Sequence, residues 1–160
     1  MSQRPSGVPE GSPQISSTLF YRDPRAAIDW LEKAFGFQAR VIVDGPDGSI
    51  AHSELVLGDG IIGVAGEASG GPVARGRSPR SLDDAYTQAL YVFVPDIEAH
   101  YTRARDAGAK IVREPETAHY GDRNYGALDP EGHLWFFGQR VDADAWESAN
   151  REHLVAREGE

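Results

Sequence analysis

Hydrophobic residues recur along the chain with strand-like and helix-like periods, and these periods predict a first set of elements. β-branched, aliphatic and aromatic residues at positions 15–21 suit a strand. Apolar residues then recur at the spacing of one helix face, from a capping Asp23 to about Phe35, and Gly36 is a typical stop. Three short β segments follow, separated by Gly-rich turns, at residues 40–43, 50–57 and 61–65.

The same plan returns after a stretch rich in Gly, Pro, Ser and Arg at residues 67–86. A strand over residues 88–94 precedes a second helix that begins at a capping Asp96 and ends near Gly108. Further strands are predicted from Ile111 and over residues 124–128 and 134–138. The two helices have nearly equal length, and the turns that follow them lie at nearly equal distances. Such self-similarity predicts an internal repeat of two βαβββ modules.

This organisation predicts an α+β fold with one central domain. The domain is expected over residues 15–139, with module 1 at about 15–66 and module 2 at about 87–139. Residues 1–14 are rich in Pro, Gly and Ser and predict a disordered arm. Residues 140–160 predict a helical tail.

Composition narrows the class of protein further. The chain has 160 residues, no cysteine and a formal net charge of -9. Disulfides and thiolate chemistry are therefore absent, and an acidic chain without a Lys/Arg cluster is a poor nucleic-acid binder. No apolar run approaches the length of a membrane span, so the chain is expected in the cytoplasm and away from membranes.

Several motifs, in order, resemble the glyoxalase/bleomycin resistance/dioxygenase family of the vicinal oxygen chelate superfamily. They lie at residues 20–37, 51–60, 120–123 and 129–138. The resemblance implies that the two modules form a curved mixed sheet around a ligand cup, with the helices on its outer face. It also implies a homodimer, because members of the family commonly dimerise.

The resemblance bears directly on metal binding. Metal-dependent members place a His or Glu on each of four strands, and the corresponding positions here hold Ser16, Gly63, Ala89 and Phe136. None of these side chains is a competent ligand for such an ion. The chain is therefore expected to belong to a metal-independent branch, with no metal and no cofactor.

Strand alternation predicts which residues line the cup instead. Inward positions carry mainly aromatic and apolar side chains, which suit a flat hydrophobic or aromatic small molecule. The predicted contacts of this kind are Thr18, Phe20, Tyr91, Phe93 and Phe136. Alternatively, these aromatic side chains simply fill the cup or a dimer seam.

A second group of candidates is polar. His52 and Glu54 are two residues apart on a predicted strand and therefore share a face, where they could contact a ligand or act as base and acid. The alternative is a structural pair. Tyr120, Arg123 and Tyr125 flank a junction of loop and strand, and Arg123 suits either a ligand carboxylate or an ion pair with Asp122 or Glu54. Catalytic candidates are His52, Glu54 and Tyr125.

These features favour a metal-independent protein that binds a small molecule and resembles the bleomycin-type resistance proteins that sequester an antibiotic or another toxic metabolite. The alternative is a cofactor-free isomerase, lyase or cyclase of the same fold that works by proton transfer. A third hypothesis is a subunit whose cup is closed by a partner chain. A metal-dependent glyoxalase or dioxygenase is the least favoured.

Overall fold

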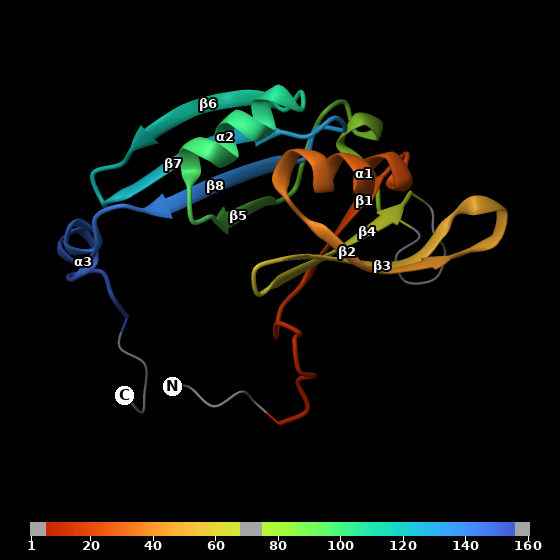
Figure 1. Cartoon of the computed structure of the whole chain (residues 1–160), viewed down its shortest axis with the longest axis horizontal. Coiled ribbons are helices and arrows are strands. Elements are labelled where there is room, and N and C mark those ends of the chain that lie inside the picture. The colour runs from red at the N-terminus through yellow and green to blue at the C-terminus, as the bar shows by residue number, and fades with distance from the viewer. Residues whose placement is uncertain (1–5, 68–74, 156–160) are drawn as a thin grey trace. The chain divides into compact units, whose positions relative to one another are not determined.

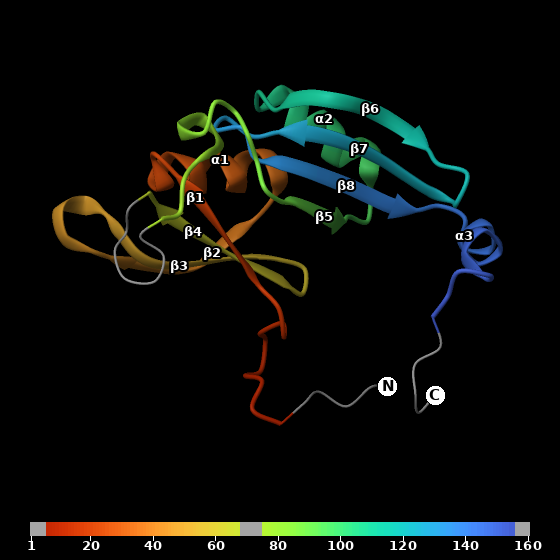
Figure 2. The same ribbon diagram turned by 180° about the vertical axis from the view of Figure 1, so that it is seen from behind.

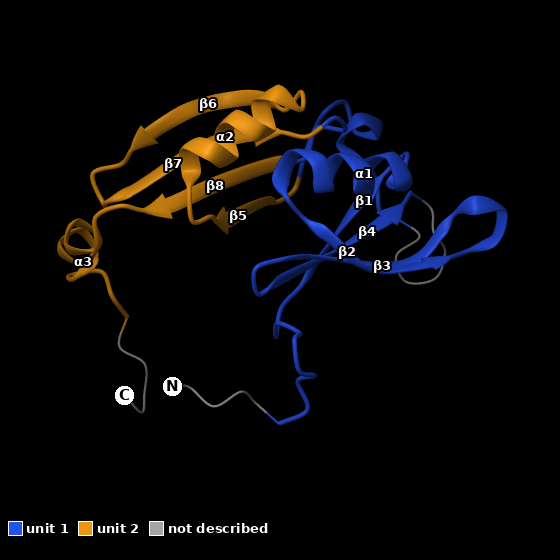
Figure 3. Cartoon of the chain, in the orientation of Figure 1, with its two compact units in different colours: residues 1–86, 130–133 blue, residues 87–129, 134–160 orange. Residues whose placement is uncertain are grey.

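The computed structural model describes residues 6–67 and 75–155 of the chain. Two compact units account for the described residues, one of residues 1–86 with 130–133 and one of residues 87–129 with 134–160 (Figure 3). Each unit contains one four-stranded mixed sheet and one covering helix. The predicted α+β fold of two βαβββ modules is therefore confirmed.

Module 1 consists of four strands and one long helix (Figure 1). The strand order is β1-β4-β3-β2, with β1 parallel to β4 and the other neighbours antiparallel. A single 3-10 turn, η1 (Pro46–Gly48), lies between β2 and β3. The elements are β1 (Ser17–Tyr21), α1 (Pro24–Phe35), β2 (Gln38–Asp44), β3 (Ile50–Leu57) and β4 (Gly60–Gly66).

Helix α1 forms for the reasons that the sequence indicated. The Asp23 carboxylate accepts a hydrogen bond from the backbone N–H of Ala26 at 3.0 Å, which satisfies one free donor of the first turn. One stripe of the helix, including Leu31 and Phe35, is completely buried. Burying each of these two side chains contributes about 1.5–3 kcal/mol, so the stripe fixes α1 against one face of the module 1 sheet.

Module 2 repeats the plan with the strand order β5-β8-β7-β6. Strands β6, β7 and β8 lie in front of α2 in Figure 2. Pro115 lies in β6, which is an edge strand and therefore tolerates the missing N–H. The elements are β5 (Ala89–Phe93), α2 (Ile97–Asp106), β6 (Lys110–Thr117), β7 (Asp122–Leu128) and β8 (Leu134–Arg140), followed by α3 (Ala143–Asn150).

The strand registers show how closely the modules correspond. Each module has a β-bulge at the same place, directly after the pair Ala39/Leu55 in module 1 and the pair Ile111/Ala127 in module 2. Residues can therefore be matched by counting from these pairs. By this count, and by the pairing of the outer strands, the counterparts are Thr18 and Tyr91, Phe20 and Phe93, His52 and Asn124, Glu54 and Gly126, Gly63 and Phe136, and Ala65 and Gly138.

In both sheets, alternate residues point to the helix and away from it. On β5 the predicted facing is confirmed, because Tyr91 and Phe93 are exposed whereas Leu90 and Val92 are half-buried and Val94 is buried. Trp135 of β8 is fully buried, as expected of a side chain under the helix. We call the side of each sheet away from α1 or α2 its helix-free face.

The turn at residues 129–132 has a structural role. The Glu131 carboxylate accepts hydrogen bonds from the backbone N–H groups of Arg22 and Asp23, at 2.7 and 2.9 Å, and from the Ser78 hydroxyl at 2.5 Å. His133 Nε2 lies 2.8 Å from the Phe20 carbonyl oxygen. These contacts hold the end of β1 and the start of α1.

The predicted outer segments are described only in part. Residues 6–14 form turns, and the Gly11 carbonyl accepts a hydrogen bond from Arg40. Residues 1–5 of the predicted arm, 68–74 of the predicted loop and 156–160 of the predicted tail lie outside the described residues. No described helix is both long enough and apolar enough to cross a bilayer.

Candidate functional site

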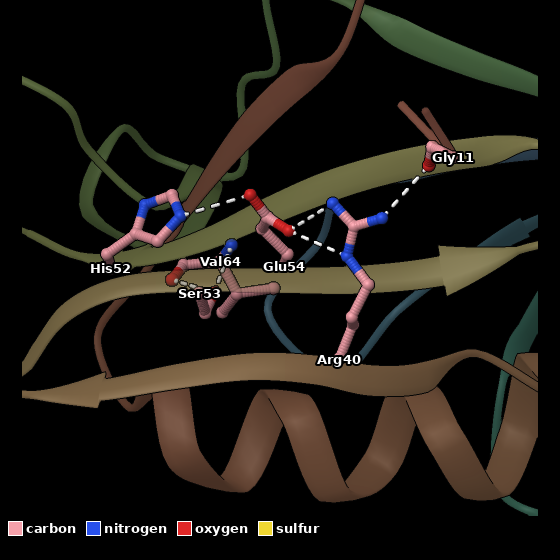
Figure 4. A network of polar contacts seen from close by, with 6 residues as sticks. All are labelled: Gly11, Arg40, His52, Ser53, Glu54 and Val64. Carbon is pink, nitrogen blue, oxygen red and sulfur yellow. Dashed lines mark hydrogen bonds and ion pairs between the residues drawn. The ribbon is translucent and has the colours of Figure 1, made fainter. Parts of the chain in front are cut away.

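The helix-free face of module 1 carries a polar cluster on β2 and β3 (Figure 4). Arg40 donates hydrogen bonds to Glu54 Oε2 from Nε at 2.8 Å and from Nη2 at 2.5 Å. The other oxygen, Oε1, lies 3.4 Å from His52 Nε2. The sequence expectation that His52 and Glu54 share one face is confirmed, with Ser53 buried on the opposite side.

A hollow of about 220 Å³ lies beside this cluster. Its floor is low because Thr18 of β1 is paired with Gly63 of β4, which has no side chain. A Cβ atom on Gly63 would lie 3.0 Å from the Thr18 hydroxyl, so the hydroxyl occupies the space above the glycine. The hollow is lined by Ser16, Thr18, Ala51, His52, Ser53, Glu54, Ile61, Gly63, Val64 and Ala65.

The charge of Arg40 decides what Glu54 can do. The hydrogen bonds from Arg40, and secondarily the contact with His52, lower the pKa of Glu54 below its ordinary value of 4.5. Glu54 is therefore an ionised carboxylate at neutral pH and is unsuited to the role of a general acid. It is suited to orienting the His52 imidazole, which is mostly exposed.

The helix-free face of module 2 carries aromatic side chains at the corresponding places. Tyr91 and Phe136 are paired on β5 and β8, and their rings are nearly parallel, at 26°, with centroids 6.5 Å apart. The centroids of the Tyr91 and Phe93 rings are 5.2 Å apart, and the two rings are tilted by 56° to each other. We call these three residues the aromatic floor.

Two glycines allow the Tyr91 and Phe136 rings to lie flat on the sheet. A Cβ atom on Gly138 would lie 2.3 Å from the Tyr91 hydroxyl oxygen, and one on Gly126 would lie 3.0 Å from Phe136 Cε1. Each ring therefore crosses the neighbouring strand at a position where no side chain stands. Partial desolvation of the Tyr91 hydroxyl group is the main cause of its raised pKa, so the phenol is neutral at physiological pH.

Polar and charged groups surround the aromatic floor. The Arg113 guanidinium lies over the Phe136 ring, 4.9 Å from its centroid, and donates a hydrogen bond to Asn124 Oδ1 at 2.5 Å. Asn124 donates in turn to the Tyr120 hydroxyl oxygen at 3.3 Å. The structure thus places Tyr120 beside the floor, together with two residues that the sequence did not single out.

The far end of the floor is closed by a second arginine. Arg140 forms an ion pair with the buried Asp122 at 2.8 Å. Its guanidinium lies 5.8 Å from the ring centroid of Phe93 and 4.5 Å from that of Trp146 on α3. Arg140 is therefore an internally satisfied cation, and its role is to hold α3 against the sheet.

Two predicted site residues lie on the wrong face. Tyr125 is fully buried under α2, where its hydroxyl lies 2.7 Å from His100 Nδ1, and burial raises its pKa. Arg123 forms an ion pair with Glu98 of α2, and not with Asp122 or Glu54 as considered from the sequence. On β7, odd-numbered residues point to the helix, so neither side chain reaches the helix-free face.

Phe20 lies on the helix-free face of module 1 as predicted, but it is partly covered. A Cβ atom on Gly76 would lie 2.2 Å from Phe20 Cδ1, so the backbone at residue 76 runs directly against the ring. Because of this contact, Phe20 exposes a smaller fraction of its surface than its counterpart Phe93 does.

The positions that hold metal in relatives do not fit an ion here. Ser16 and Gly63 in module 1, and Ala89 and Phe136 in module 2, offer one hydroxyl oxygen as their only side-chain donor. His52 and Glu54 supply two donors, but the Glu54 carboxylate is engaged by Arg40. Over residues 6–67 and 75–155, no group of three or more His, Asp or Glu is arranged to hold an ion.

Arg40, Arg113 and Asn124 are the site residues that the sequence analysis missed. The two-residue alternation of the strand at residues 124–128 places Asn124 on the same face as Gly126, so the sequence did contain a signal for Asn124. The two arginines lie at β-bulges, where the simple alternation fails.

Comparison with known proteins agrees with this geometry. Residues 14–137 match the model of the Glyoxalase/Bleomycin resistance protein/Dioxygenase superfamily. The chain belongs to this superfamily. The family resemblance noted from the motifs is thereby confirmed.

Several relatives of this superfamily member are similar over most of their length. The uncharacterized protein Rv0887c of Mycobacterium tuberculosis (strain ATCC 25618 / H37Rv) is 33% identical over 136 residues, which cover 81% of this chain and 75% of that protein. The crystal structure of TioX from Micromonospora sp. ML1 is 32% identical, with a TM-score of 0.64, and the match covers 81% of this chain and 100% of TioX. The virulence protein STM3117 from Salmonella typhimurium shares the fold, at 23% identity and a TM-score of 0.58, over 79% of this chain and 94% of that one.

Proposed function

We propose that this superfamily member is a metal-independent protein that binds a planar aromatic small molecule on the aromatic floor of module 2. The observation that carries the proposal is the exposure of Tyr91 and Phe93, 45% and 58%, on the side of the sheet away from α2. Large aromatic side chains supply much of the binding energy where they contact ligands. The exposed rings of Tyr91 and Phe93 are therefore suited to contact a flat aromatic ring.

Metal independence is part of the proposal and rests on residue chemistry. The four positions that hold metal in relatives supply no imidazole or carboxylate, and Phe136 is part of the floor instead. By analogy with family members that sequester a compound, the ligand would be an antibiotic or an aromatic metabolite that is bound and released unchanged. Homodimeric assembly and a cytoplasmic location remain predictions. Sedimentation of the purified protein would test the homodimer.

The test compares two exposed tyrosines. Tyr91→Ala removes part of the floor, whereas Tyr86→Ala removes a side chain of similar exposure, 48%, from another part of the chain. We expect Tyr91→Ala to weaken the binding of a planar probe, 2-naphthamide, by up to about tenfold, since an aromatic contact is worth about 0.5–1.5 kcal/mol beyond simple burial. Isothermal titration calorimetry measures both variants against the wild type.

Two further measurements address turnover and metal. Mass spectrometry should recover the probe unchanged at one equivalent per chain, and elemental analysis of the purified protein should find no stoichiometric transition metal. Equal probe affinity in all three proteins, or a tightly held metal whose removal abolishes binding, would refute the proposal.

The alternative function, a cofactor-free enzyme that acts by proton transfer, has one specific observation in its favour. His52 stands beside the hollow of module 1, with the ionised Glu54 at 3.4 Å to orient it. In this hypothesis His52 is the base and Glu54 an orienting group. Turnover of any identified substrate that survives His52→Ala at full rate would remove that base.

A further inference from the structure

Arg113 is a cation beside the aromatic floor whose charge no described carboxylate neutralises. Its guanidinium lies over the Phe136 ring and donates to the amide oxygen of Asn124, which is neutral. Over the described residues, no carboxylate oxygen lies within 4.0 Å of the Arg113 guanidinium, in contrast to Arg140 at the other end of the floor. The side chain is exposed, so its remaining N–H groups can reach a ligand.

Module 1 shows what an arginine at this bulge does when its own module supplies an anion. Arg40 is the bulge residue there, and Glu54 on the next strand neutralises it. The counterpart of Glu54 in module 2 is Gly126, opposite Arg113 on the next strand. By the same count the bulge residue of module 2 is Val112, and Arg113 is the residue that follows it. Module 2 therefore has an arginine next to its bulge but no carboxylate opposite it on the neighbouring strand.

The surroundings of Arg113 make it a receptor for an anion that is attached to a ring. Stacking on Phe136 and the bond to Asn124 hold the guanidinium plane in place, so little side-chain freedom remains to be lost on binding. A guanidinium binds a carboxylate through two parallel N–H donors, and such charge-assisted bonds are stronger than neutral ones. The aromatic floor lies directly beside this cation.

We infer that the ligand is a planar aromatic anion, with an oxyanion such as a carboxylate bound by Arg113 and its ring on the exposed Tyr91. This inference rests on the proposed binding function and adds the charge of the ligand to it. The ligand would supply to module 2 the negative charge that Glu54 supplies to module 1.

The experiment uses two probes of the same shape, 2-naphthoate and its neutral isostere 2-naphthamide. Dissociation constants are measured by calorimetry at low ionic strength for the wild type, Arg113→Met and the control Arg105→Met, which alters an exposed arginine on α2. We expect the wild type to prefer naphthoate about tenfold, as a charge-assisted hydrogen bond allows. Arg113→Met should remove the preference, whereas Arg105→Met should retain it.

Two more measurements keep the result interpretable. Arg113→Lys retains the charge but loses the planar fork, so we expect an intermediate preference. Added salt should weaken naphthoate binding and leave naphthamide binding unchanged, since screening acts on the charged pair alone. Circular dichroism establishes that each variant is folded, which is expected for substitutions at an exposed side chain.

The possible failures are distinguishable. Equal binding of both probes by the wild type, or an equal loss for both probes in Arg113→Met, would overturn the inference about charge and leave the proposed floor intact. Binding of neither probe, or binding that Tyr91→Ala does not weaken, would overturn the proposed function and this inference with it.

Discussion

The two modules share one backbone plan and present opposite surfaces on it. The strand order, the covering helix and the position of the bulge are the same in both. At the paired outer positions, however, module 1 has Thr18 and Gly63 where module 2 has Tyr91 and Phe136. Small side chains leave a hollow in module 1, and large ones build a floor in module 2.

On the inner strands the difference is reversed, with the larger side chain in module 1 and the smaller in module 2. Module 1 has a charged side chain at Glu54, and module 2 has Gly126, across which Phe136 lies. A ring can lie flat on a sheet only if the neighbouring strand offers no side chain at the crossing point. Large and small residues are thus distributed in a correlated way, because the rings of Tyr91 and Phe136 each lie over a glycine of the neighbouring strand.

The largest expected effect comes from replacing Gly138 of module 2 with alanine, the residue at its counterpart Ala65 in module 1. In Gly138→Ala the new methyl carbon would lie 2.3 Å from the Tyr91 hydroxyl oxygen, so the ring must leave its place. We expect a loss of about 1–3 kcal/mol in the free energy of unfolding, as for other overpacked sites, together with loss of naphthamide binding. Urea unfolding and calorimetry measure the two effects.

The matched control is the reverse exchange in module 1. Ala65→Gly empties the corresponding position beside the hollow and should cost at most about 1 kcal/mol, mainly through chain entropy, with no effect on binding. If Gly138→Ala and Ala65→Gly had equal effects on stability and binding, Gly138 would not be what allows the Tyr91 ring to lie on the sheet.

A smaller effect is expected at Tyr125, on the covered side of module 2. Tyr125→Phe deletes a buried hydroxyl and leaves His100 Nδ1 without this partner, which should cost about 1–2 kcal/mol of stability and leave probe affinity unchanged. Thermal unfolding and probe titration measure the two quantities. Weaker binding at unchanged stability would restore Tyr125 as a ligand contact.

The smallest effect concerns the ion pair of module 1. Because Arg40 lowers the pKa of Glu54 in the folded protein, the pair stabilises the fold above the ordinary value of 4.5, and this stabilisation is lost as pH falls through the lowered pKa. In Arg40→Gln we expect the Glu54 pKa, measured by carbon NMR of the carboxyl group, to rise. The stability difference from wild type should be present at neutral pH and vanish in acid.

The control for this titration is Arg25→Gln, which removes the exposed ion pair with Asp44 elsewhere in module 1. It should leave the Glu54 pKa unchanged. A Glu54 carboxyl that titrates identically in wild type and Arg40→Gln would mean that the pair does not persist in solution. Exposed ion pairs contribute little to stability in general, so we expect the Glu54 pKa to be the clear indicator of the Arg40–Glu54 pair.

The amino-acid sequence by itself determined the repeat, the two helices and the faces of the straight strands. Asp23 and Asp96 cap their helices as predicted, with hydrogen bonds to Ala26 and Ala99. The placement of Tyr91 and Phe93 on one face followed from alternation alone. These features rest on local preferences and on the two-residue period of a strand, which the chain carries without reference to its partners.

Only the tertiary structure decided which charged groups meet. Arg40 reaches Glu54, and Arg123 reaches Glu98, because strand register and helix packing bring distant residues together. The bulges also place Arg40 and Arg113 where the two-residue alternation gives no guidance. An inserted residue changes the face of a side chain for a reason that lies in the pairing with the neighbouring strand, and that pairing is absent from any local pattern.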